Sequence, residues 1–271
     1  QLELAMQRHR QLIDALRNQF CHSDKTDSIK VIETHISSVL LTGQFAYKIK
    51  KPVKFGFLDF STLANRHFFC NEELRLNRRL SSGLYLDVEP IRGTLSNPIL
   101  NGSGTVLDYA IKMKQFPAGQ LFSEIADTRQ LSSNHIDQLA VQIADFHASS
   151  EQADCDSRLA SIQNIKHWFD ENFVQIRPLL ADDVDIQSLV LLQHWGENEW
   201  LRVQGFFELR QRQAYIREGH GDLHLSNITL IGNVITPFDC IEFNPMLRWI
   251  DVMNDVAFLL VDLLHSDYRQ L

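Results

Sequence analysis

The chain has 271 residues, of which 44% are hydrophobic, and its formal net charge is −8. This length and composition predict one large domain or two lobes with a substantial core. It shows no apolar run of membrane-spanning length, no secretory signal and no long basic stretch, which predicts a cytoplasmic protein that binds neither membranes nor nucleic acid. The cysteines are widely spaced, which predicts buried free thiols rather than a zinc site or a disulfide framework; they are Cys21, Cys70, Cys155 and Cys240.

The first part of the chain is predicted to be rich in strands. Apolar residues at helical spacing predict a leading helix over residues 2–20. Five β-rich runs predict strands over residues 31–33, 38–41, 45–50, 85–90 and 106–113. A hydroxyl cap at Ser61 and Thr62 predicts a helix over residues 65–80. Residues 93–104 are rich in Gly, Asn, Ser and Pro and predict a loop.

The second part is predicted to be mostly helical, with long helices over residues 136–149, 162–180 and 186–216. We therefore predict an α+β, two-lobe fold, with a smaller β-rich lobe over residues 1–116 and a helical lobe over residues 117–271. Residues 116–119 are the expected hinge. The apolar run 256–264 predicts a helix that packs on something, and because little follows it, we expect a fragment of a longer polypeptide.

One stretch carries the strongest chemical signal, His220-Gly221-Asp222-Leu223-His224-Leu225-Ser226-Asn227, followed by Phe238-Asp239. Phosphoryl transfer needs a carboxylate to orient and deprotonate the attacking hydroxyl, and oxygen ligands for the Mg²⁺ that bridges the phosphates of ATP. Asp222 fits the first role, and Asn227 and Asp239 fit the second. The competing interpretation is that these are ordinary turn and strand-end residues.

A predicted hairpin brings these residues together. Two β-rich runs, residues 228–231 and 234–238, flank Gly232-Asn233, a two-residue turn signal. The hairpin returns the chain, so that Asp239 is expected beside Asn227 and Asp222.

A site for ATP also needs a cation for the phosphates. Lys48 lies in the strand over residues 45–50, and Lys50 is its rival because alternate residues of a strand share a face. An acidic partner is expected from the helix over residues 65–80, where Glu73 is preferred to Glu72. The chain has neither a Gly-x-Gly-x-x-Gly loop nor a P-loop signature, although hydroxyls of residues 33–38, Ser37 among them, could hold phosphate oxygens.

Together these residues resemble the aminoglycoside phosphotransferase family, which shares the protein kinase fold. The likeness covers nearly the whole chain and is closest to bacterial proteins that join such a domain to a C-terminal P-loop kinase-like domain. It is carried by residues 33–37, 47–52, 56–63, 76–80 and 238–243. It implies a protein-kinase-like fold, a small-molecule acceptor, and a P-loop domain in the full-length protein.

The resemblance also assigns roles. Asp222 resembles the catalytic base, Asn227 and Asp239 the metal ligands, and Lys48 with Glu73 the phosphate-binding ion pair. Residues 113–116, with Gln115 and Phe116, resemble the hinge that binds adenine, and Asp255 resembles a brace of the catalytic loop. The chain departs from protein kinases at Cys240-Ile241, which stand where Phe-Gly would follow the metal-binding aspartate.

The function expected is ATP- and Mg²⁺-dependent transfer of a phosphoryl group to a hydroxyl of a small molecule. The alternative is a nucleotide-binding, pseudokinase-like regulatory module of a larger protein, and a protein kinase is a weaker third interpretation. Aromatic residues of the helical part, among acidic ones, could bind an amine-bearing sugar, but helix packing is the preferred explanation; they are Trp168, Phe169, Phe173, Trp195, Trp200, Phe206 and Phe207. His147 is expected to be a packed core residue.

Overall fold

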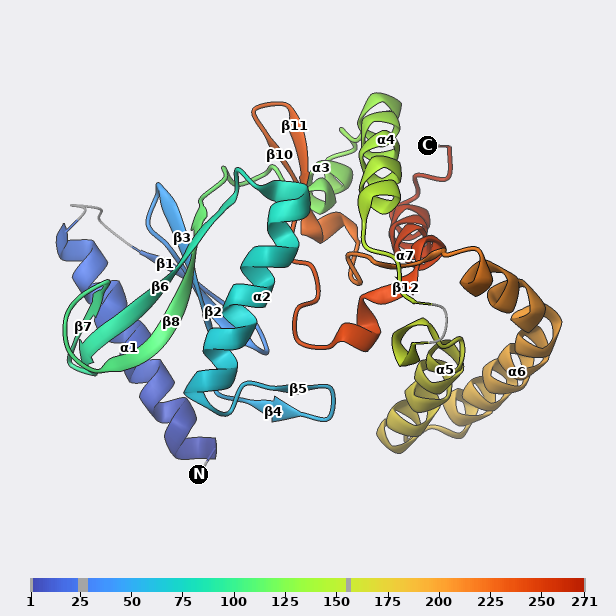
Figure 1. Cartoon of the computed structure of the whole chain (residues 1–271), viewed down its shortest axis with the longest axis horizontal. Coiled ribbons are helices and arrows are strands. Elements are labelled where there is room, and N and C mark those ends of the chain that lie inside the picture. The colour runs from blue at the N-terminus through green and yellow to red at the C-terminus, as the bar shows by residue number, and fades with distance from the viewer. Residues whose placement is uncertain (1, 24–28, 155–156, 271) are drawn as a thin grey trace.

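The computed structural model describes residues 2–23, 29–154 and 157–270. The chain is α+β, with a curled antiparallel sheet followed by a largely helical region (Figure 1). The sheet has six strands in the order β1-β2-β3-β8-β6-β7. Their bounds are Lys30–Glu33 (β1), Ser37–Leu41 (β2), Phe45–Lys50 (β3), Tyr85–Thr94 (β6), Asn97–Leu100 (β7) and Val106–Lys114 (β8).

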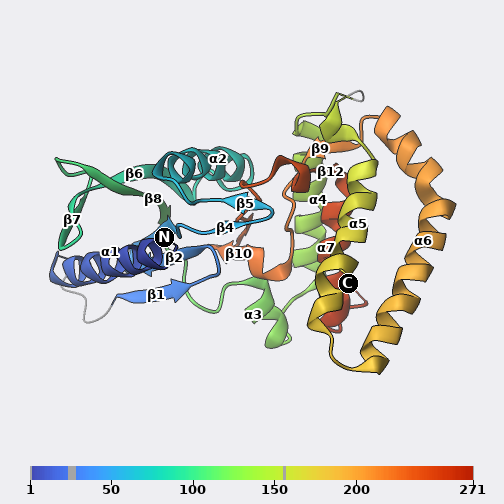
Figure 2. The same ribbon diagram turned by 90° about the horizontal axis from the view of Figure 1, so that it is seen from below.

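Two helices cover opposite faces of this sheet, as Figure 2 shows. On one face α1 (Leu2–Ser23) buries Leu12 and Leu16 against Tyr47 and Ile49 of β3. On the other, α2 (Leu63–Ser81) packs through Leu74 in a core cluster that includes Ala46. Because residues alternate between the faces of a strand, β3 directs its even-numbered residues toward α2.

The predicted elements of this first part are confirmed, apart from two omissions. The loop expected over residues 93–104 contains the strand β7, which pairs with β6. A two-stranded hairpin of β4 (Lys54–Phe55) and β5 (Leu58–Asp59) was not expected. The hydroxyl cap of α2 is confirmed at Thr62, whose side chain accepts a hydrogen bond from the Asn65 N–H at 3.1 Å.

The helical region contains two short two-stranded sheets. One is the predicted hairpin, β10 (Ile228–Ile231) with β11 (Val234–Pro237), and the other pairs β9 (Ile216–Glu218) with β12 (Trp249–Asp251). The helices are α3 (Phe122–Asp127), α4 (Ser133–Ser149), α5 (Gln163–Ile176), α6 (Asp183–Arg212) and α7 (Val252–His265). The helix predicted to reach residue 216 ends at Arg212, since Ala214 adopts φ +60° and Ile216 begins β9.

The apolar helix α7 packs on one side only. Leu263 is buried in the core cluster with Phe122 and Leu139, whereas Phe258 and Val261 are exposed. In the outer helix α6, buried residues are Leu189 and Gly196. The packing expected for the aromatic residues is confirmed at buried Phe173 but is wrong for Trp195 and Phe206, which are 61% and 65% exposed.

Three of the four cysteines lie within the described residues. Cys70 and Cys240 are buried free thiols, as predicted, and Cys21 is a partly buried one. Cys155 lies outside the described residues. Across the ranges that the structure describes, no helix combines the length and apolar character needed to cross a bilayer.

Candidate active site

The predicted hairpin forms with the expected register. Ile231 pairs with Val234, and Gly232 and Asn233 between them have φ of +54° and +66°. Positive φ at both turn residues is the geometry that matches the twist of two-residue hairpins. The Phe238 N–H donates to the Asn227 carbonyl at 2.9 Å. The hairpin therefore sets Asp239 directly beside Asn227, as the sequence predicted.

Asp222 and Asn227 are held together by hydrogen bonds. The Asn227 side-chain amide donates to the Asp222 carbonyl at 3.0 Å and to its carboxylate Oδ2 at 3.2 Å. The Asp222 carboxylate also lies 3.4 Å from His224 Nε2, and this contact raises the pKa of His224. His224 was missed in the sequence, although it stands inside the motif. The contact gives Asp222 a second neighbour that fixes its orientation.

Asp239 has an unusual backbone. Its φ is +66°, a left-handed conformation that costs free energy for a residue with a Cβ and persists only where its surroundings hold it. Lys48 Nζ lies 2.5 Å from Asp239 Oδ1. Burial alone would raise the pKa of the Asp239 carboxyl, but the charge of Lys48 holds it below its usual value. Asp239 therefore stays a carboxylate, with its side chain 38% exposed.

Lys48 and Lys50 share Glu73 but differ in their second partner. Lys48 Nζ binds Glu73 Oε1 at 2.7 Å as well as Asp239, and it joins the sheet, α2 and the hairpin at one point. Lys50 also binds Glu73, through Oε2 at 2.6 Å, and its other partner is Glu242. The preference for Glu73 over Glu72 is supported, because Glu73 is fully buried between the two lysines whereas Glu72 pairs with Arg75.

The loop that carries Asp222 is braced from α7. Asp255 accepts the backbone N–H groups of His220 and Gly221, each at 2.8 Å. His147 Nε2 lies 3.0 Å from the same carboxylate, so this histidine is the buried core residue that was expected. Gly221 has φ +88°, and a Cβ there would lie 2.7 Å from the Leu247 carbonyl, so the position requires glycine.

Two further braces were missed in the sequence. Asp262 accepts the Leu225 N–H at 2.7 Å, which fixes the same loop about two turns further along α7. Asn77 of α2 accepts the Cys240 N–H at 3.0 Å and donates to the Glu73 carbonyl at 2.9 Å. Asn77 thereby ties the segment after Asp239 to the helix that carries Glu73.

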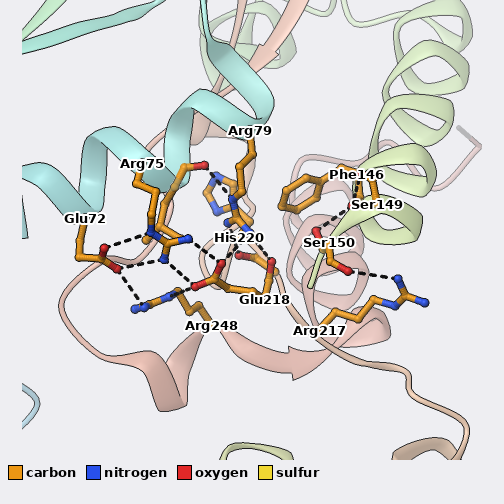
Figure 3. A network of polar contacts seen from close by, with 12 residues as sticks. Glu72, Arg75, Arg79, Phe146, Ser149, Ser150, Arg217, Glu218, His220 and Arg248 are labelled. Atoms are coloured by element: carbon orange, nitrogen blue, oxygen red, sulfur yellow. Dashed lines mark hydrogen bonds and ion pairs between the residues drawn. The ribbon is translucent and has the colours of Figure 1, made fainter. Parts of the chain in front are cut away.

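A network of arginines fastens α2 to the strand before the loop (Figure 3). Glu218, at the end of β9, accepts hydrogen bonds from Arg75 at 2.8 and 3.0 Å and from Arg248 at 3.0 Å. Arg79 reaches the Glu218 carboxylate at 3.2 Å and the Gly219 carbonyl at 3.1 Å. The Glu218 side chain is 4% exposed. The network holds α2, and with it Glu73, against the segment that leads into the Asp222 loop.

The other predicted binding residues, Ser37, Gln115 and Phe116, all contact other parts of the protein. Ser37 is 1% exposed, and its hydroxyl lies 2.9 Å from Thr34 Oγ1 within a tight turn, so it faces inward. Both the backbone and the side chain of Gln115 form hydrogen bonds within the protein. Its backbone N–H donates to the Gln44 carbonyl at 3.0 Å, and its side-chain oxygen accepts the Gly43 N–H at 2.8 Å. The Phe116 ring packs 5.5 Å from that of Phe238, beside the hairpin.

The side-chain oxygens of Asn227 and Asp239 are suitable ligands for a magnesium ion. Because the Asn227 amide nitrogen is bound to Asp222, its oxygen remains as an acceptor, and Asp239 supplies a carboxylate. Mg²⁺ prefers such oxygen ligands and binds through one or two of them, together with waters and phosphates. Among the described residues, no group of three or more His, Cys, Asp or Glu is arranged to hold a metal alone.

No family model matches the chain. It is similar to three uncharacterized mycobacterial proteins, Mb2027c of Mycobacterium bovis and Rv2004c and MT2060 of Mycobacterium tuberculosis. Each is 28% identical over 235 residues, which cover 87% of this chain and 46% of the relative. The chain thus spans about half the length of the curated relatives it matches.

Proposed function

We propose that this chain is an ATP- and Mg²⁺-dependent phosphotransferase with a two-lobe, protein-kinase-like fold, acting on a hydroxyl of a small molecule. One observation carries the proposal, the Lys48 ammonium group that binds both Glu73 and Asp239. A buried lysine between a helix carboxylate and a metal-binding aspartate is the arrangement that kinases use for the phosphates of ATP. The sequence likeness to aminoglycoside phosphotransferases supports the same activity.

The residues divide the work. Asp222 would orient the acceptor hydroxyl and take its proton as the oxygen attacks the terminal phosphorus of ATP, whose bond to the bridging oxygen breaks to release ADP. Lys48 binds phosphate oxygens, and Glu73 keeps that lysine in place. Asn227 and Asp239 would hold Mg²⁺, which neutralises charge on the phosphates. Asp255 and Asp262 fix the loop so that Asp222 needs no reorganisation during transfer.

The test replaces the base without disturbing its surroundings. Asp222→Asn keeps the shape and the acceptor for the Asn227 amide but removes the proton acceptor. Transfer from labelled ATP to a panel of hydroxyl compounds, amine-bearing sugars included, is expected to fall by about 10² to 10⁴-fold. ATP binding is expected to change little. Unchanged transfer in this variant would contradict the proposal.

A second candidate is a nucleotide-binding regulatory module of a longer protein. It is favoured by the segment that leads into β2, where the Ser37 hydroxyl faces inward and residues 33–38 contain no glycine. It predicts ATP binding without transfer to any acceptor. The same panel separates the two candidates, since transfer by this chain would exclude a purely regulatory role.

A further inference from the structure

The strand β3 places two buried lysines on one carboxylate. Glu73 is fully buried, with Oε1 2.7 Å from Lys48 Nζ and Oε2 2.6 Å from Lys50 Nζ. Transfer of phosphate requires one such lysine, and Lys48 is the one that also reaches Asp239. The second lysine therefore calls for an explanation, because burying a charge is costly unless it is paired.

Lys50 is enclosed by protein. Its side chain is 1% exposed, it is paired with Glu242, and its Nζ lies 4.8 Å from the centre of the Phe60 ring. Burial alone would lower the pKa of Lys50, but the carboxylates of Glu242 and Glu73 raise it, so the lysine stays charged. Lys50 is closed to a ligand and acts only on its protein neighbours.

The position of Glu242 in the sequence shows what the Lys50–Glu242 ion pair connects. Glu242 follows Asp239 by three residues, and its side chain is 4% exposed. The Lys50–Glu242 pair therefore ties the segment that carries Asp239 to the strand that carries Lys48. Asn77 fastens the same segment to α2 through the Cys240 N–H.

Binding of ATP would reduce the compensation that Lys48 gives to the buried charge of Glu73. Lys48 is shared between Glu73 and Asp239, and it would turn part of its charge to the phosphates of ATP. With Lys48 as sole partner, the buried Glu73 would lose compensation at that moment, which is strongly unfavourable. Lys50 remains on Glu73 Oε2 throughout, since no ligand competes for it.

We propose that Lys50 and Glu242 are positioning residues, which keep Glu73 paired and the Asp239 segment in place while Lys48 engages ATP. This inference rests on the proposed function. It assigns the two lysines of β3 different roles. Lys48 binds the ligand, and Lys50 holds in place Glu73 and the Asp239 segment, which position Lys48.

The test removes both members of the pair. Replacing one partner of a buried ion pair is strongly destabilising, whereas replacing both with apolar residues of similar volume is often tolerated. Lys50→Met/Glu242→Met is therefore expected to melt close to the unmodified protein. Calorimetric titration with ATP and Mg²⁺ is expected to show an affinity lower by about tenfold. Lys54→Met, at an exposed lysine outside the cluster, is the matched control and should keep full affinity.

The outcomes distinguish failure of the positioning role from failure of the proposed phosphotransferase function. A folded double variant that binds ATP and Mg²⁺ as tightly as the unmodified chain overturns the inference alone. Failure of the unmodified chain to bind overturns the proposed function and the inference with it. If the double variant does not fold, Glu242→Gln leaves Lys50 paired with Glu73 and keeps an oxygen that can accept from Lys50, so that it loosens only the Asp239 segment. It should raise the Mg²⁺ concentration needed at saturating ATP several-fold, and an unchanged Mg²⁺ requirement overturns the inference.

Discussion

Asp255 accepts the backbone N–H of Gly221 at 2.8 Å, and this bond ties the first turn of α7 to the loop that carries Asp222. The same carboxylate accepts the His220 N–H at 2.8 Å. Both donors are buried, and Gly219 leaves the room that Asp255 needs, since a Cβ there would lie 2.5 Å from its Oδ2. The loop is thus positioned by a residue that need not touch any ligand.

Asp255→Ala is expected to destabilise the protein and to disorder the loop. It leaves two buried N–H groups without an acceptor, and each such group costs about 1 to 3 kcal/mol. We expect the free energy of unfolding, measured by urea denaturation, to fall by about 3 kcal/mol.

Asp267→Ala serves as the control for this loss. Asp267 is an acidic residue in the same part of the chain, with a side chain 78% exposed and φ +61°, so its removal should cost only about 1 kcal/mol from backbone strain. Equal stability of the Asp255 and Asp267 variants would show that Asp255 does not brace the loop.

Glu218 predicts a stability change in acid. Burial would raise the pKa of its carboxyl, but hydrogen bonds from Arg75 and Arg248 outweigh burial and lower the pKa to about 2. The carboxylate therefore stabilises the fold fully above pH 4.5, and this contribution is lost as the pH falls through 4.5 toward 2. From the size of the shift, Glu218→Gln should lower the free energy of unfolding by about 3 kcal/mol at pH 7.

The pH dependence distinguishes this network from simple packing. The difference between the unmodified protein and Glu218→Gln should shrink as the pH falls below 4.5, because the unmodified side chain becomes neutral too. A difference that stays constant down to pH 3 would contradict the account. Glu199→Gln, at a helix-surface pair with Arg202, should show no measurable change at any pH.

The buried side chain of His9 predicts a second pH dependence of stability, which begins at higher pH than that of Glu218. Its side chain lies between α1 and the sheet, with Nε2 2.9 Å from Ser38 Oγ, and burial lowers its pKa to about 4. Between pH 6.5 and 4 the unfolded chain binds a proton that the folded chain does not, so stability falls as the pH falls through this range. Over this range the free energy of unfolding is expected to fall by about 3 kcal/mol.

Replacing His9 should remove this dependence. Urea denaturation of His9→Gln is expected to give a difference between pH 7 and pH 5 smaller than that of the unmodified protein. The exposed residue His194 offers the matched control, since His194→Gln should retain the unmodified difference. Equal pH sensitivity in both variants would mean that His9 is not buried in the neutral form.

The sequence predicted the local elements well, because local rules govern them. The turn at Gly232-Asn233 fixes the β10–β11 register without reference to the rest of the chain, and the proximity of Asn227 and Asp239 follows from it. The alternation of β3 likewise placed Lys48 and Lys50 on one face. The strand pattern alone does not distinguish Lys48 from Lys50 as the residue that binds phosphate.

What could not be predicted depends on contacts distant in sequence. Lys48 and Asp239 are separated by 191 positions, and only the packed fold shows that Lys48 takes this partner. Asp262 lies within the apolar run 256–264, and only the folded chain shows that its carboxylate faces the Leu225 N–H. The Ser37 hydroxyl is a candidate for holding phosphate oxygens by sequence, but the turn that Ser37 closes with Thr34 directs it inward.

The central claim is that Asn227, Asp239 and Lys48 form an assembled site for ATP and Mg²⁺. Calorimetric titration of ATP into the protein, with and without Mg²⁺, tests it most directly. The account predicts binding that requires Mg²⁺ and that weakens by about tenfold or more in Asp239→Asn, which removes the charged metal ligand. No binding, or binding indifferent to both Mg²⁺ and the Asp239 carboxylate, would contradict it.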